Sequence, residues 1–252
     1  MTDLLESSKY SVAHAQRHIA TLVSELRTFH ATDPYQQVVE FDPTGSTDIH
    51  KLKLAKQLPD TLPGIAFDAV SSLRASLDQA GYSIAMAAGG SGSAAYFPFG
   101  DTKTEVESRA TGASRELPPS VFQAMLSAKP YRDGDVYLWA LNRLCNHHKH
   151  RCITPVAIYT GGASLHNAYF SSVRSFSFPP RWDPDRQEMI LAEVPHRAPF
   201  TMNMQIQTFV SFSGIEALPP TPCDFVLQKI TDAIMLLLET LSIECRSLGL
   251  QK

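Results

Sequence analysis

The stretch KPYRDGDVYLWALNRLCNHHKHRCITPV, residues 129–156, contains the point at which the sequence changes from helical to strand periodicity. Its apolar residues first recur at helical spacing, which predicts a helix from about Asp135 to His150. After Arg151 the apolar and polar residues alternate with a period of two, which is typical of half-buried strands. The chain is therefore predicted to be an α+β protein.

Other helices are predicted on both sides of this point. Residues 4–29 carry apolar side chains at three- and four-residue spacing, which places them on one face of a long amphipathic helix. Similar patterns predict helices over residues 65–88, 120–128 and 224–248. The glycine-rich segment 87–96 follows a helix and lacks a phosphate-binding lysine, so a flexible linker is predicted there rather than a phosphate loop.

Strand patterns occur early and late in the chain. Segments 36–42 and 49–55 are predicted to form a hairpin, because turn-forming residues lie between them. Four more strands are predicted over residues 152–160, 165–176, 187–194 and 202–212. Their alternation favours an antiparallel sheet with one solvent-exposed face.

Length and composition predict a single domain over residues 1–252. The chain is 44% hydrophobic and 19% charged, and it is long enough to bury one sizeable core. We expect residues 1–150 to form a mainly helical core with an early β-hairpin. Residues 151–215 would supply antiparallel strands, and residues 224–248 a C-terminal helix.

The net charge and the lengths of the apolar runs argue against two classes of partner, nucleic acid bound over a basic surface and the membrane. A formal net charge of -3 argues against an overall basic surface for nucleic acid, although a local basic site is compatible with it. The longest late apolar run, residues 233–238, is far shorter than the roughly 20 residues that span a bilayer. The N-terminus lacks signal-peptide features, and the four cysteines are interpreted as free thiols. We predict a cytoplasmic protein without a membrane partner.

The polar face of the 135–150 helix carries residue types suited to acid–base chemistry on phosphodiesters. Arg143, Asn146 and His150 follow one another at helical spacing and project from one face. Imidazole exchanges protons near neutral pH, and guanidinium stabilises charge developing on phosphate. We therefore predict His150, Arg143 and Asn146 as catalytic residues. Lys149 and Arg151 would bind the substrate through its phosphates, and no cofactor is expected.

Three segments together resemble a widespread group of uncharacterised bacterial proteins. These segments are LRASLDQA at residues 73–80, the Phe97-Pro98 dipeptide, and residues 129–156. Members of that group carry an LRSALDH-type helix followed by an N-x-D-KHR-type motif. The likeness covers about the first 155 residues, and its specific positions are Trp139, Leu141, Asn146, Lys149, His150 and Arg151.

The helical arrangement and an arginine–histidine spacing also resemble the HEPN superfamily. Four residues separate Arg143 from His148, and six separate it from His150. The resemblance implies a HEPN-like helical bundle with an appended antiparallel β-sheet. It also implies a homodimer that acts on RNA as a metal-independent endoribonuclease in bacterial defence or toxin systems.

Arg74 and Asp78 allow two interpretations. Their spacing of four residues on the 65–88 helix is that of an ordinary intrahelical ion pair. If they instead face His150, Asp78 could orient its imidazole and raise its basicity, as a carboxylate does in hydrolytic triads. The LRSALDH-type resemblance favours this supporting role.

The 146–151 motif also has non-catalytic interpretations. Cations at a helix C-terminus complement the exposed carbonyl groups, so the motif could be purely structural within an interaction or ligand-binding domain. A metal site is the weaker alternative, because ligands at consecutive helical positions point in different directions. That alternative would use Cys145, His147, His148, His150 and Cys152, completed by Cys223 and His166 or His196. We predict no metal.

Overall fold

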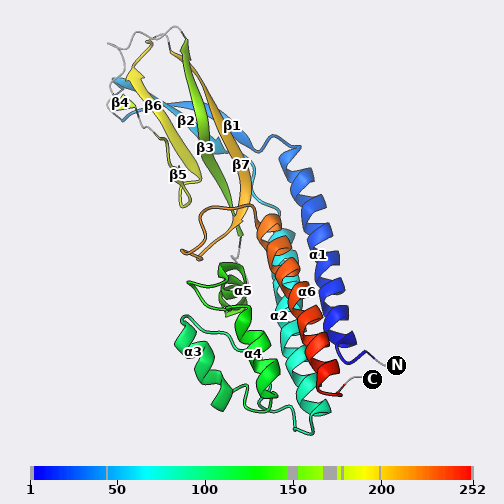
Figure 1. Cartoon of the computed structure of the whole chain (residues 1–252). Helices are drawn as coiled ribbons and strands as arrows, with labels where there is room; N and C mark the ends of the chain where they lie inside the picture. Colours follow the sequence, from blue (N-terminus) through cyan, green and yellow to red (C-terminus); the bar gives the residue numbers. More distant parts are fainter. Residues whose placement is uncertain are drawn as a thin grey trace. The chain divides into compact units, whose positions relative to one another are not determined.

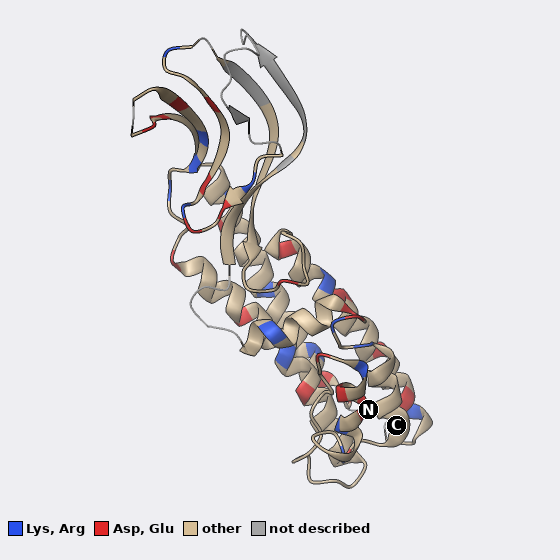
Figure 2. Ribbon diagram, turned by 90° about the vertical axis from the view of Figure 1, so that its left-hand side faces the viewer, with Lys and Arg blue, Asp and Glu red and all other residues tan. Residues whose placement is uncertain are grey.

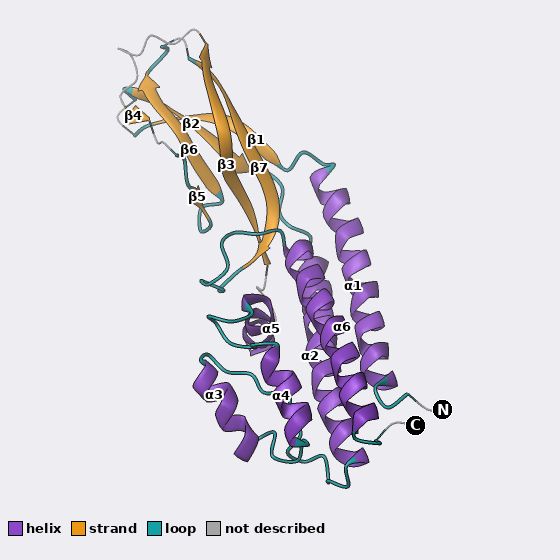
Figure 3. Cartoon of the chain, viewed as in Figure 1, coloured by secondary structure: helices purple, strands orange, loops and turns teal. Residues whose placement is uncertain are grey.

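The computed structural model describes residues 3–43, 45–146, 153–166, 175–176, 179–198 and 200–250, and it confirms an α+β protein (Figures 1 and 3). The chain divides into two compact units. The helical unit comprises Met1–Ser24, Asp60–Cys152 and Phe212–Lys252, and the sheet unit comprises Glu25–Pro59 and Ile153–Ser211. Each unit is assembled from separated segments, so the division does not follow the order of helices and strands along the sequence.

Three long helices and several short ones form the helical unit. They are α1 (Glu6–His30), which runs past the division after Ser24, α2 (Thr61–Ala87), α3 (Lys103–Ser108), the 3-10 helix η1 (Arg109–Thr111), α4 (Pro119–Ser127), α5 (Val136–Asn146) and α6 (Cys223–Ser247). Helix α5 packs against both α2 and α6, and α2 and α6 also contact each other. Their shared core includes Leu73 and Leu77 of α2 and Ile230 and Ile234 of α6, all fully buried.

The predicted helices 4–29, 65–88, 120–128 and 224–248 correspond to α1, α2, α4 and α6 within a few residues. The periodicity succeeds here because each of these helices buries one apolar face. The helix predicted over 135–150 is present as α5 up to Asn146, and its last four residues lie outside the described residues.

Helix α3 was not predicted, because its sequence KTEVES is almost entirely polar. A side-chain cap starts it: the Thr102 hydroxyl accepts a hydrogen bond from the Glu105 backbone N–H at 3.2 Å. The Glu105 carboxylate accepts one at 2.8 Å from the N–H of Asp101, the residue before the cap. Val106 is fully buried and anchors the helix. Local capping and the burial of one apolar side chain thus stabilise this helix, which has no apolar face of the kind that periodicity detects.

The glycine-rich loop after α2 is held by a carboxylate. Both oxygens of Glu116 accept hydrogen bonds from this loop, at 2.6 Å from the Gly92 backbone N–H and at 2.9 Å from the hydroxyls of Ser91 and Ser93. Gly92 has a φ of +75°, and a Cβ there would lie 2.4 Å from the ring of Tyr82. The loop is therefore anchored by the protein's own anion, which a composition-based prediction of a linker does not anticipate.

The sheet unit contains two separate sheets. A five-stranded sheet has the order β1-β2-β6-β4, with β5 also paired to β6, and a two-stranded sheet pairs β3 with β7. The bounds are β1 (Tyr35–Phe41), β2 (Thr47–Leu54), β3 (Ile153–His166), β4 (Ser175–Phe176), β5 (Trp182–Asp183), β6 (Glu188–Pro195) and β7 (Thr201–Phe212). The predicted early hairpin is confirmed, and it pairs antiparallel with the late strand β6.

An apolar cluster joins the two sheets of this unit. Leu52, Met189 and Leu191 come from the five-stranded sheet, whereas Ala157 comes from β3, and residues of β7 pack against them. Lys51 is only 7% exposed and lies 2.9 Å from the carboxylate of Glu188. The lysine alternation on β2 therefore marks a buried ion pair rather than a fully solvated face.

Candidate active site

The chemistry-bearing residues predicted on α5 are positioned by the way that the helix starts and packs. The Asp135 carboxylate caps the helix by accepting hydrogen bonds from the backbone N–H groups of Tyr137 and Leu138, both at 2.9 Å. Leu141 and Leu144 are buried against the rest of the helical unit. The faces of α5 that are not buried in this way carry its polar residues.

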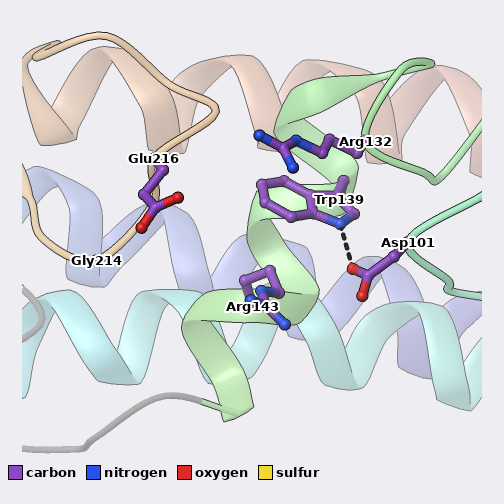
Figure 4. Close-up of a pocket in the computed structure, with 6 residues that line it drawn as sticks. All are labelled: Asp101, Arg132, Trp139, Arg143, Gly214 and Glu216. Atoms are coloured by element: carbon purple, nitrogen blue, oxygen red, sulfur yellow. Dashed lines mark hydrogen bonds between the residues drawn. The ribbon is translucent and has the colours of Figure 1, made fainter.

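Trp139 is the centre of a polar cluster beside α5 (Figure 4). Its indole N–H donates a hydrogen bond to the Asp101 carboxylate at 2.8 Å. The guanidinium of Arg143 lies 5.5 Å from the centroid of the ring, and that of Arg132 lies 5.9 Å from it. Both distances suit cation–π contacts. We call Asp101, Arg132, Trp139 and Arg143 the open cluster.

Backbone contacts place Arg132 and Asp101 next to each other. The Arg132 N–H donates to the Asp101 carbonyl at 3.3 Å, and the Gly134 N–H closes a turn onto the Tyr131 carbonyl at 2.9 Å. A Cβ at Gly134 would lie 2.4 Å from the Lys129 carbonyl oxygen, so the turn requires glycine. The tight turn aims Arg132 back toward Trp139.

A pocket of about 310 Å³ opens beside the open cluster, and those of its lining residues that the structure describes belong to the helical unit. Besides the four residues of the open cluster, Gly214 and Glu216 line it from the loop after β7. In Figure 4 this loop lies across the pocket from Trp139. Trp139 is 6% exposed, so its ring forms the floor and the two guanidinium groups supply the polar surface.

The pocket combines two cations, Arg132 and Arg143, with two carboxylates, Asp101 and Glu216. Within the part of the chain that the structure describes, the guanidinium groups of Arg132 and Arg143 make no ion pair. The nearest carboxylate of the cluster, that of Asp101, already accepts the indole hydrogen bond. Lys and Arg residues are otherwise interspersed with Asp and Glu along the described ribbon (Figure 2). The two guanidinium groups are therefore without an ion-pair partner among the described residues and can bind an anion, although Asp101 and Glu216 also place carboxylates at the pocket.

The predicted site residues are only partly described. Arg143 lines the pocket, whereas Asn146 is exposed and donates a 3.4 Å hydrogen bond to the Asn142 side chain one turn earlier. The predicted acid–base residue His150 and the predicted substrate-binding residues Lys149 and Arg151 lie outside the described residues. Their predicted roles remain predictions.

Arg74 and Asp78 form the ion pair that their spacing predicts. An Arg74 guanidinium nitrogen lies 2.6 Å from an Asp78 carboxylate oxygen, and the guanidinium also stacks on Phe99 at 4.3 Å from its centroid. The other Asp78 oxygen accepts a hydrogen bond from the Phe97 backbone N–H at 3.1 Å. We call Arg74, Asp78 and Phe99 the paired cluster. Their predicted support of His150 involves a residue outside the described part of the chain.

Cys145 is poorly suited to act as a thiolate. Burial raises the pKa of its thiol to about 11, and its sulfur lies 3.7 Å from the Val70 carbonyl oxygen. Among the described residues, no group of three or more His, Cys, Asp or Glu side chains is arranged to hold a metal ion. His147, His148 and Cys152 of the alternative metal site lie outside that part of the chain.

Arg132, Asp101, Gly214 and Glu216 were not predicted as site residues. The sequence gives one usable signal, the Asp133-Gly134 pair, which predicts a tight turn next to Arg132. Glu216 lies more than 70 residues after Arg143, and only the packing of α5 and α6 brings its loop to the pocket.

Comparisons with protein-family models, with curated proteins and with solved structures find no match to this chain. The HEPN-like resemblance therefore rests on the sequence motifs alone. None of the described helices has the length and apolar character needed to cross a membrane.

Proposed function

We propose that this protein binds RNA and that Arg132 and Arg143 hold an RNA phosphate in the pocket beside Trp139. The observation that carries the proposal is the pair of guanidinium groups, both unpaired among the described residues, at the rim of a concave site. Guanidinium is the side chain best matched to phosphate geometry. A phosphate would give the two guanidinium groups the ion-pair partner that they lack among the described residues.

RNA cleavage is the activity that we propose for this site, as a metal-independent endoribonuclease of HEPN-like type. The reaction would use Arg143 of the pocket together with His150, which six residues separate from it in the sequence. In such a reaction the 2′-oxygen bonds to phosphorus, the bond from phosphorus to the 5′-oxygen breaks, and a proton leaves the 2′-hydroxyl while another reaches the 5′-oxygen. His150 would exchange these protons, with Lys149 and Arg151 on flanking phosphates and Asn146 positioning the substrate.

Binding is tested first. The affinity of a short single-stranded RNA is measured by fluorescence anisotropy for the wild type and for Arg132→Gln and Arg143→Gln. Each substitution removes one charge-assisted hydrogen bond, so each should weaken binding by about tenfold or more. Arg246→Gln is the matched control, because Arg246 is exposed on α6 outside the pocket. Equal losses in all three variants would reject the pocket as the phosphate site.

Cleavage is tested separately with His150→Ala in the presence of EDTA. The proposal expects cleavage by the wild type, loss of cleavage in the variant, and an unchanged melting temperature. Retained RNA binding in His150→Ala would separate the chemical step from recognition. If the wild type binds RNA without cleaving it, the proposed ribonuclease activity is rejected and the proposed RNA-binding site is kept.

The second candidate function is a non-catalytic ligand-binding or interaction domain in which residues 149–151 are structural. It is favoured by the described lining of the pocket, which comes from the open cluster, Gly214 and Glu216 and does not include Asn146. Leu144, where active HEPN motifs commonly carry a polar residue, is 3% exposed and belongs to the core. A large fall in melting temperature for His150→Ala, with no cleavage by the wild type, supports this function.

A further inference from the structure

Glu216 places a carboxylate in the same pocket as the two arginines. It follows Ile215, which is 8% exposed, in a turn that the Leu218 N–H closes onto the Ile215 carbonyl at 3.1 Å. Among the described residues, no partner forms a hydrogen bond or ion pair with the Glu216 side chain. The pocket therefore has, at one side, an exposed carboxylate without a partner among the described residues, carried on a hydrogen-bonded backbone turn.

The acceptor and the cations stand on different elements. Glu216 comes from the loop before α6, whereas Arg132 and Arg143 come from the start and the end of the α5 region. Figure 4 shows Glu216 on the side of the pocket away from the Trp139 hydrogen bond to Asp101. A ligand that satisfies both sides needs an anion at one end and N–H donors at the other, which is the layout of a nucleotide.

The chemistry of the bases then decides between nucleotides. A carboxylate has two acceptor oxygens and no donor, so it pairs best with two adjacent N–H groups. On their Watson–Crick edges, adenine and cytosine each place a ring-nitrogen acceptor beside the amino group, and uracil flanks its one N–H with two carbonyls. Guanine alone presents two neighbouring donors, N1–H and the 2-amino group. Unpaired bases of RNA are read on this edge.

We propose that Glu216 makes the pocket selective for guanine, with the guanine edge on the Glu216 carboxylate and the phosphate on Arg132 and Arg143. The inference rests on the proposed function, because it takes the phosphate site as given. The volume of about 310 Å³ is at the lower end of the range for small-ligand sites, roughly 300–1,000 Å³, which suits one nucleotide.

Asp101 is not equivalent to Glu216 in this role. One of its oxygens already accepts the indole N–H at 2.8 Å, and its backbone joins it to Arg132. A bidentate contact would need both carboxylate oxygens. The selectivity is therefore assigned to Glu216.

The test compares three nucleotides by isothermal titration calorimetry on the full chain. GMP carries both donors, IMP lacks the 2-amino group, and AMP presents the mismatched edge. GMP should bind about tenfold or more tightly than IMP, because one hydrogen bond to a charged group is lost, and AMP should bind no better than IMP. Glu216→Gln should remove most of the preference for GMP over IMP, because the side-chain amide keeps only one acceptor oxygen. Glu239→Gln, an exposed carboxylate on α6, is the matched control and should keep the preference.

The contrary outcomes are distinct. Equal affinity of the wild type for the three nucleotides, with all three weakened by Arg143→Gln, overturns the guanine selectivity and leaves the phosphate site. A preference for GMP that survives Glu216→Gln overturns the assignment to this residue. If none of the nucleotides and no RNA binds, the proposed function falls together with the inference. Melting temperatures of all variants, measured in parallel, exclude unfolding as the cause of a loss.

Discussion

The paired cluster and the open cluster use the same three chemical groups to different ends. Each places a guanidinium near an aromatic ring, and each includes an aspartate. In the paired cluster the aspartate neutralises Arg74, whereas in the open cluster Asp101 accepts the indole hydrogen bond of Trp139 and leaves Arg143 without an ion pair among the described residues. Whether an arginine is available to a ligand therefore depends on which group the neighbouring carboxylate binds.

The two clusters are also linked along the chain. Phe99 belongs to the paired cluster, the Phe97 N–H binds its Asp78, and Asp101, two residues after Phe99, belongs to the open cluster. The rings of Phe97 and Phe99 lie 4.7 Å apart and are buried. The segment 97–101 thus contacts α2 through Phe97 and Phe99 and contacts Trp139 of the pocket through Asp101.

The largest expected effect comes from Asp78→Ala in the paired cluster. The change leaves the partly buried Arg74 without its counter-charge and the Phe97 N–H without its acceptor. We expect a loss of about 2 kcal/mol in the free energy of unfolding, less than for a fully buried pair because both side chains keep some exposure. Urea denaturation measures this loss.

Glu107→Ala is the matched control for that prediction, since Glu107 forms an exposed pair with Lys103 at the same spacing of four residues. Its cost should stay within about 0.5 kcal/mol. If the two substitutions cost the same, the paired cluster has no structural role beyond that of a surface ion pair.

A smaller effect is expected from Trp139→Phe in the open cluster. The ring volume is largely kept but the N–H donor is lost, so Asp101 becomes available to Arg132 and Arg143. We expect a loss of about 1 kcal/mol in stability together with weaker RNA binding, because the guanidinium groups gain an internal partner. Unchanged RNA affinity in this variant would show that the indole does not keep the carboxylate from the cations.

The salt dependence of RNA binding gives a finer measure of the open cluster. A phosphate contact to single-stranded nucleic acid contributes a slope of roughly 0.7 in log affinity against log salt concentration. Arg143→Gln should therefore reduce the magnitude of the slope by about 0.7. Arg74→Gln should leave the slope unchanged, because the Arg74 charge is paired. A change of slope in Arg74→Gln would contradict the inference that only the open cluster offers a free cation to RNA.

The smallest expected effect concerns Glu116, which holds the glycine-rich loop after α2. Hydrogen bonds from Ser93, Ser91 and Gly92 lower the pKa of its carboxyl below the ordinary value of 4.5. A lowered folded-state pKa contributes stability above pH 4.5 that is lost as the pH falls through the folded value.

This predicts that the difference in melting temperature between the wild type and Glu116→Gln is present at neutral pH and shrinks in acid. Thermal melts over a pH series measure the difference. A difference that stays constant down to about pH 3 would mean that hydrogen bonds to the ionised carboxylate do not stabilise the loop.

The sequence predicted the helices and the early hairpin well, for a physical reason. Periodic burial of α1, α2 and α6 and the turn residues between β1 and β2 act over short distances along the chain. The division of the strands into two sheets was not predictable in this way, because β2 pairs with β6 more than 130 residues later. Alternation fixes the face of a strand but does not choose its neighbour.

The site follows the same rule. Residue types and spacing on one helix singled out Arg143. For Arg74 and Asp78 the spacing left two interpretations, an intrahelical ion pair or support of His150, and the structure contains the ion pair. They could not reveal that Asp101 binds the Trp139 indole or that Arg132 and Glu216 share its pocket. Local periodicity in the sequence determined which side chains each helix presents. The tertiary structure alone decided whether the cations of the pocket keep a free charge, because that depends on how carboxylates from distant loops are used.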